Sequence, residues 1–192
     1  QGVVAVFERN RFDQYSNFAR IGEGSLGGKG RGLAFIDNII KRHPTVNRFD
    51  NATVMIPKTV VLCTDIFEEF MDTNDLYPIA LSDADDSEIL AAFRAAHLPR
   101  RLLGDFLTYI EATQSPVAVR SSSLLEDSHY QPFAGIYNTY MVPYLDDRRR
   151  MLLMLSDAIK GVYASVYFKD SKAYMQATRN VIDQEKMAVI IQ

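Results

Sequence analysis

Six of the ten glycines in this 192-residue chain lie in one eleven-residue stretch, residues 22–32. Glycine has no Cβ, so the backbone N–H groups of such a stretch can approach a ligand that a side chain would keep away. Successive backbone N–H groups form concavities that bind anions. Lys29 lies near the end of the stretch, and the apolar residues that follow recur at helical spacing. A glycine loop, a lysine and a helix start together are typical of a phosphate site.

Known glycine-loop motifs fit this stretch poorly. The P-loop requires a glycine five positions before its Gly-Lys pair and a hydroxyl residue after it, where this chain has Glu23 and Gly30. Residues 22–27 match the dinucleotide fingerprint G-x-G-x-x-G, but residues 18–21 before them are short for a strand. We interpret the stretch as a phosphate loop of another type. A tight turn between packed elements and a dinucleotide site are the alternatives.

Composition narrows the class of protein. The net charge of −3 argues against a nucleic-acid surface, and the arginines at 148–150 form too short a run to change this. No stretch approaches the roughly 20 apolar residues that span a bilayer, so no membrane partner is expected. The one cysteine, Cys63, cannot form an internal disulfide and lies in an apolar run. It predicts a buried structural thiol in a reducing, cytoplasmic compartment.

Helical and strand patterns mix along the chain without strict βαβ repetition, which predicts an α+β fold. Residues 1–17 show no clear period and are expected to form an irregular arm. We expect helices at 29–42, from 64 onward, around 89–93, and at 99–113, 146–167 and 168–178. We expect strands at 59–63, 117–119, 137–142 and 187–191.

An acidic cluster precedes the apolar-periodic run at 89–93; its members are Asp83, Asp85, Asp86 and Glu88. Acidic residues before such a run indicate a helix N-terminus. We prefer that interpretation to a metal site.

A second group of polar residues follows the apolar strand at 117–119. Arg120 ends the strand, three serines follow, and a polar loop is expected at 121–131. A guanidinium group binds phosphate oxygens bidentately and stays charged at any relevant pH. The alternative is a salt bridge from Arg120 to a neighbouring carboxylate, with the serines in a turn.

The two groups occur with further blocks that together resemble a known family. The blocks lie at 25–33, 56–62, 117–127, 133–135, 158–165 and 187–192. Their order and spacing are similar to those of the nucleotide-binding domain shared by phosphoenolpyruvate synthase, pyruvate phosphate dikinase and related water dikinases. The resemblance covers roughly residues 18–192. It implies an ATP-grasp-like fold in which two lobes, approximately 18–115 and 116–192, close on ATP.

The resemblance also implies roles for individual residues. Lys29 and Arg120 correspond to the lysine and arginine that contact ATP phosphates, and residues 121–135 correspond to a mobile loop over them. We expect residues 122–132 to be mobile without ligand. The candidate nucleotide-binding residues are Gly27, Gly28, Lys29, Arg120, Ser121, Ser122, Glu126, Asp127 and Gly135.

The function implied is that of the ATP-binding part of a dikinase. Such an enzyme phosphorylates a histidine on another domain of its own longer chain, and the phosphate passes to pyruvate on a further domain. The alternatives are the same domain in a water dikinase or an antibiotic phosphotransferase, a non-catalytic nucleotide-sensing module, and a dinucleotide-dependent dehydrogenase. The family's Mg²⁺-binding acids and the rest of its adenine pocket correspond to positions after Gln192. We therefore expect a domain truncated at its C-terminal end.

Residues 1–192 alone are expected to be catalytically inert and to bind ATP weakly, because Mg²⁺ must neutralise the phosphates and its ligands are expected elsewhere. Calorimetry with ATP and Mg²⁺ measures this directly. Low-micromolar binding, or ATP cleavage that depends on Lys29, would contradict the expectation.

Overall fold

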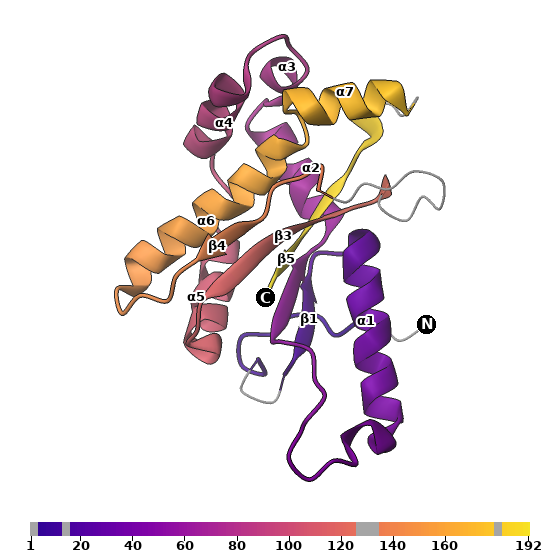
Figure 1. Cartoon of the computed structure of the whole chain (residues 1–192). Coiled ribbons are helices and arrows are strands. Elements are labelled where there is room, and N and C mark those ends of the chain that lie inside the picture. The colour runs from indigo at the N-terminus through magenta and orange to yellow at the C-terminus, as the bar shows by residue number, and fades with distance from the viewer. Residues whose placement is uncertain (1–3, 13–15, 126–134, 179–181) are drawn as a thin grey trace.

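The computed structural model describes residues 4–12, 16–125, 135–178 and 182–192. Its centre is a mixed sheet with the strand order β1-β2-β5-β3-β4 (Figure 1). β1 and β2 run parallel, and the pairs β2–β5, β5–β3 and β3–β4 are antiparallel. The strands are β1 (Phe18–Ile21), β2 (Thr59–Leu62), β3 (Val117–Ser123), β4 (Tyr140–Val142) and β5 (Met187–Ile191).

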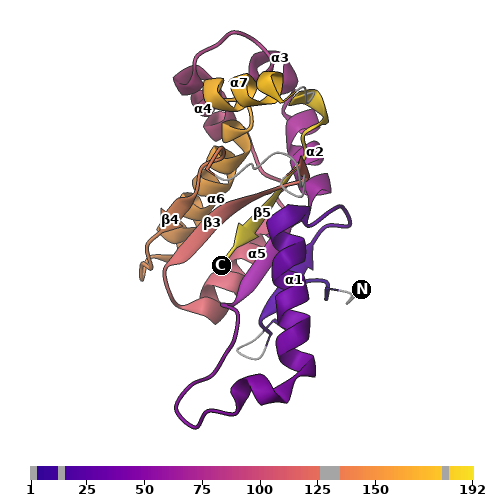
Figure 2. The ribbon, with the colours of Figure 1, turned by 45° about the vertical axis from the view of Figure 1, so that its right-hand side comes forward.

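The helices divide between the two faces of the sheet. α1 lies on one face, and α5 and α6 lie on the other (Figures 1 and 2). α3, α4 and α7 gather at one end of the molecule. The helices are α1 (Gly27–Arg42), α2 (Thr64–Thr73), α3 (Tyr77–Ala80), α4 (Asp86–Ala95), α5 (Leu102–Thr113), α6 (Arg148–Ser165) and α7 (Lys169–Ala177), with 3₁₀ turns at Pro44–Asn47 and Ile182–Gln184.

Strand alternation builds a separate apolar layer on each face of the sheet. Val60 and Leu62 face the larger layer, which contains the buried sides of α2, α5 and α6. Val61 and Ile190 face the smaller layer under α1. Successive side chains of a strand point to opposite faces, so these apolar runs supply both layers at once.

The α+β class is confirmed, and the sheet joins the two halves of the chain. β5 lies between β2 and β3. Strands from the expected lobes 18–115 and 116–192 therefore belong to one sheet, and residue 115 does not separate two sheets. The two-lobe ATP-grasp-like arrangement stays an expectation.

β3 is longer than predicted. Ser121, Ser122 and Ser123 continue the strand opposite Val189, Ala188 and Met187 of β5, and they are at most 4% exposed. The expectation of a loop from residue 121 was wrong here, because pairing with an apolar strand overrides the turn preference of serine. For the same reason the first two residues of the expected mobile segment 122–132 are strand residues; residues 126–132 lie outside the described ranges.

The beginning of the glycine stretch also differs from the prediction. Residues 18–21 do form a strand, and α1 begins at Gly27 rather than at residue 29. β1, the loop, α1 and the parallel strand β2 thus form a βαβ unit. The glycines at 27, 28, 30 and 32 belong to the helix and not to a loop before it.

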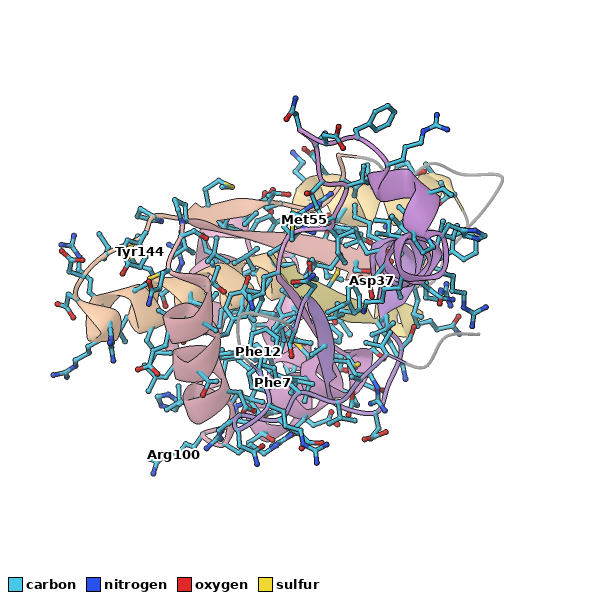
Figure 3. All side chains as sticks on the ribbon, turned by 90° about the horizontal axis from the view of Figure 1, so that it is seen from below. Phe7, Phe12, Asp37, Met55, Arg100 and Tyr144 are labelled. Atoms are coloured by element: carbon cyan, nitrogen blue, oxygen red, sulfur yellow. The ribbon has the colours of Figure 1, made fainter. Side chains whose placement is uncertain are left out.

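The described part of the N-terminal arm is irregular, as expected, but it is anchored. Val6 bridges Arg20 of β1 in parallel, and the Phe7 N–H donates to the Arg20 carbonyl at 2.8 Å. The rings of Phe7 and Phe12 lie side by side, 4.6 Å between centroids, and both are buried (Figure 3). The arm therefore closes the free edge of β1.

The acidic cluster is confirmed as a helix start. Asp85 is the N-cap of α4, and its Oδ1 accepts from Ser87 Oγ at 2.6 Å and from the Glu88 N–H at 3.0 Å. The hydroxyl and then the backbone donor hold the pKa of Asp85 below its usual value. Among the described residues, no group of three His, Cys, Asp or Glu is placed to hold a metal.

Two further features concern the burial of apolar segments. Cys63 is fully buried, as predicted, and burial raises the pKa of its thiol to about 11. The stretch Arg148–Ala177 is long and apolar enough to resemble a membrane span, but 61% of its most apolar window is buried in this core. The apolar character of this stretch is therefore accounted for by packing.

We predict that Phe70→Ala lowers the free energy of unfolding by about 3–5 kcal/mol, since a large buried ring leaves a cavity. Phe70 is fully buried, and its ring centroid lies 5.3 Å from that of Tyr163 and 5.9 Å from that of Phe93. Urea denaturation measures the change. The control Phe35→Ala, whose side chain is 65% exposed on α1, should change it by less than about 0.5 kcal/mol. Equal losses in the two variants would contradict the assignment of the core.

Candidate functional site

The N-terminus of α1 is docked on the end of β3 through one serine. The Ser122 hydroxyl donates to the Leu26 carbonyl at 2.7 Å and accepts from the Gly30 N–H at 2.9 Å. Gly27 has φ +69°, and a Cβ there would lie 1.9 Å from the Ser122 carbonyl oxygen. Only glycine permits this approach. The sequence predicted Ser122 as a nucleotide contact, but the structure gives its buried hydroxyl a structural role.

Lys29 lies in the first turn of α1 and reaches β3. Its Nζ is 3.4 Å from Ser121 Oγ. β4 pairs with β3 only along residues 117–119, so this contact lies beyond the paired part of that edge. The helix N-terminus adds the partial positive charge of its N–H groups to that of the ammonium. The structure thus brings together Gly27, Gly28, Lys29 and the two serines; their role toward a nucleotide stays a prediction.

Arg120 lies on the same strand, one residue from Ser121. It shares a strand face with Ser122, which contacts α1, so it lies on the α1 side of the sheet. Its Nη1 donates to Gln192 Oε1 at 2.9 Å. Within the described part of the chain, Arg120 forms no ion pair with a carboxylate, so the salt-bridge alternative gains no support there.

Gln192 and Thr59 were not singled out by the sequence, and they complete a polar row across three strands. Gln192 Nε2 donates to Thr59 Oγ1 at 3.2 Å, and the Thr59 hydroxyl donates to the Pro57 carbonyl at 2.8 Å. A guanidinium only donates and a carbonyl only accepts, so the direction of every bond in the row is fixed. In the sequence, Gln192 directly follows the predicted buried strand at 187–191. This position was the signal that could have identified it.

The first half of the glycine loop is already occupied by protein groups. The N–H groups of Glu23 and Gly24 donate to the two Asp65 oxygens at 2.9 Å each. The Ser25 N–H donates to Thr64 Oγ1, also at 2.9 Å. The N–H groups of residues 23–25 are therefore bound within the protein, and the predicted nucleotide contacts at Gly27, Gly28 and Lys29 lie outside this part of the stretch. Cys63 holds the N-cap position of α2, and Thr64, the first residue of that helix, binds the loop.

These contacts also argue against a dinucleotide site. That fingerprint needs open space at its second glycine, so that the pyrophosphate can approach the backbone. Here a Cβ at Gly24 would lie 2.6 Å from Thr64 Oγ1 and 2.7 Å from the Asp65 nitrogen. The start of α2 fills the position that the pyrophosphate would need, although strand, loop and helix follow in the required order.

Three predicted site residues remain: Gly135, Glu126 and Asp127. Gly135 is exposed, with φ +80° and nothing within 4 Å of its Cβ position. Glu126 and Asp127 lie outside the described residues.

A cavity of about 830 Å³ lies elsewhere, between the turn before α4 and α7. Two of its charged side chains are engaged within the protein: Asp86 accepts from the Lys169 N–H at 2.8 Å, and Lys172 Nζ donates to the Ser82 carbonyl at 2.8 Å. Burial is the main cause that lowers the pKa of Lys172. We do not assign the nucleotide site to this cavity.

The fold and the site define a class of protein: an α+β domain in which a glycine-rich helix N-terminus is docked on a strand that carries an arginine. A comparison with family models gives the particular family. Residues 23–192 match the model described as pyruvate phosphate dikinase, AMP/ATP-binding domain, and the chain belongs to this family. It is the ATP/AMP-binding part of a pyruvate phosphate dikinase-like enzyme. A comparison with curated proteins finds no match.

We predict that Gly27→Ala destabilises the domain by more than about 2 kcal/mol, because positive φ and overpacking each cost about 1–2 kcal/mol or more. Gly32→Ala is the matched control on the same helix. Nothing lies within 4 Å of its Cβ position, so it should stabilise by about 0.5–1 kcal/mol. Thermal denaturation compares the two. Similar behaviour of both variants would contradict the close contact between α1 and β3.

Proposed function

We propose that the first turn of α1 and the second half of β3, from Arg120 onward, bind the phosphates of ATP. The observation that carries the proposal is the contact of Lys29 with Ser121, the neighbour of Arg120. The flexible ammonium of Lys29 thus approaches the strand that carries the planar guanidinium of Arg120, which supports the proposal. Phosphoryl transfer depends mostly on positioning and on neutralisation of developing charge. A cation at a helix N-terminus and a second cation on the strand that it contacts can supply both.

The two cations differ in what they can do. The ammonium of Lys29 is a compact charge on a flexible stem and can follow a phosphate oxygen as the site closes. The guanidinium of Arg120 has five N–H donors, of which the Gln192 contact uses one. It can therefore bind a phosphate bidentately while Gln192 fixes its plane.

In the full-length enzyme, we propose that a phosphoryl group passes from ATP to a histidine on another domain and then to pyruvate. In the first step a phosphorus–oxygen bond of ATP breaks and a bond from phosphorus to an imidazole nitrogen forms. Membership of the pyruvate phosphate dikinase family supports this route. Mg²⁺ would neutralise the phosphates, with ligands proposed to come from outside this chain.

Lys29→Ala and Arg120→Ala in the full-length protein should each raise the dissociation constant for ATP about ten- to hundredfold. A hydrogen bond to a charged group is worth about 1.5–3 kcal/mol, and 1.4 kcal/mol is tenfold in affinity. Calorimetry measures the constant, and circular dichroism checks that the fold survives.

Lys41→Ala and Arg149→Ala are the matched controls. Lys41 lies on α1 in an exposed pair with Asp37, and Arg149 is exposed on α6. Both controls should bind ATP like the wild type. Wild-type affinity and turnover in Lys29→Ala would overturn the assignment.

The acceptor is tested separately. Full-length protein with labelled ATP should form an acid-labile phosphoenzyme, and added pyruvate should discharge it. A phosphoenzyme that pyruvate leaves intact would contradict the proposed acceptor and favour another substrate of the same domain.

A further inference from the structure

The carboxylate of Asp65 occupies the anion-binding position of the glycine loop. One oxygen receives the Glu23 N–H and the other receives the Gly24 N–H, each at 2.9 Å. The loop is shaped around this group: a Cβ at Gly22 would lie 2.5 Å from Asp65 Oδ1, and Gly22 has φ +98°. Backbone concavities of this kind bind anions such as phosphate. Here an internal side chain takes the place of the ligand.

Asp65 is itself held by the start of α2. It lies in the first turn of that helix, where the helix dipole favours a negative charge. The carboxylate thus connects two electropositive elements, the helix start and the loop N–H groups. This connection is independent of any bound nucleotide.

A short series of contacts leads from Asp65 to Lys29. Next to Asp65, Thr64 binds Ser25 twice: its Oγ1 accepts from the Ser25 N–H at 2.9 Å, and its N–H donates to the Ser25 carbonyl at 3.0 Å. Ser25 Oγ then accepts from the Gly27 N–H at 3.1 Å. Lys29 follows within the first turn of α1.

We propose that Asp65 is a positioning residue, whose carboxylate fills the anion-binding concavity of the glycine loop and thereby holds Lys29 and the α1 N-terminus in place for nucleotide phosphates. This inference rests on the proposed function. It divides the glycine loop into two parts, in which Glu23 and Gly24 bind a protein carboxylate and the first turn of α1 faces the nucleotide. The carboxylate also keeps phosphate out of the first part, because two anions do not share one concavity.

The first test compares Asp65→Asn with Asp72→Asn in the full-length protein. The asparagine amide has one acceptor oxygen and one NH₂ group, so one of the two backbone N–H groups would face another donor. The loop should therefore loosen. Asp72 is exposed on the same helix and makes a matched control. Affinities for ATP and for AMP are measured by calorimetry, and melting temperatures are measured without nucleotide.

Asp65→Asn should reduce the ratio of ATP affinity to AMP affinity about tenfold, because the phosphates lose their positioned partners while the adenosine contacts remain. Asp72→Asn should leave the ratio unchanged. A parallel loss for both nucleotides would show a merely structural role and overturn the inference, as would an unchanged ratio. Failure of the wild type to bind ATP at all would overturn the proposed function first, and the inference with it.

The second test uses the wild type and so does not depend on whether the variant folds. Amide hydrogen exchange should show the N–H groups of Glu23 and Gly24 protected without nucleotide and unchanged when ATP binds. The N–H groups at 28 and 29 should become slower on ATP binding. Fast exchange at 23 and 24 that ATP suppresses would place phosphate in the concavity and overturn the inference.

Discussion

The contact between Ser122 and the start of α1 is the interaction on which the candidate site depends. One buried hydroxyl both donates to the Leu26 carbonyl and accepts from the Gly30 N–H. It thereby uses one of the N–H groups that a helix start leaves unsatisfied. The absence of a side chain at Gly27 lets the two backbones come together. Without that approach, Lys29 would not reach the strand that carries Arg120.

The glycine stretch serves two purposes that its composition does not separate. Its first part accepts the start of α2, through Asp65 and Thr64, and its second part accepts β3. In both parts, glycine makes room for another segment of the same protein. This is the role that the alternative interpretation, a tight turn between packed elements, assigned to the glycines. The first turn of α1 nevertheless carries Lys29 beside Ser121, so packing and a phosphate site are compatible in one loop. The glycines that pack the loop also fix the position of the helix start.

The central position of β5 explains why one sheet contains both halves of the chain. β5 is apolar along its whole length because it is paired on both edges and covered on both faces. Its continuation places Gln192 opposite Ala118 and beside Thr59, where it meets Arg120. A strand that closes the core thus also orients a candidate ligand-binding residue. Because successive side chains of a strand point to opposite faces, the pairing that buries β5 also decides on which face its polar neighbour Gln192 lies.

The sequence by itself determined the class of fold, most helices, β5 to the residue, the acidic start of α4 and the burial of Cys63, because apolar periodicity and capping are local signals. It also singled out Lys29 and Arg120 by their chemistry and neighbours. Only the tertiary structure decided which N–H groups of the glycine stretch donate hydrogen bonds to other protein groups. Asp65 lies 41 residues from Gly24, and no local pattern reveals that its carboxylate fills the loop. The serines after Arg120 were likewise misassigned to a loop, since their strand conformation depends on pairing with a segment more than 60 residues away. Contacts between distant segments decide which polar groups remain for a ligand, and these contacts exist only after the chain has folded.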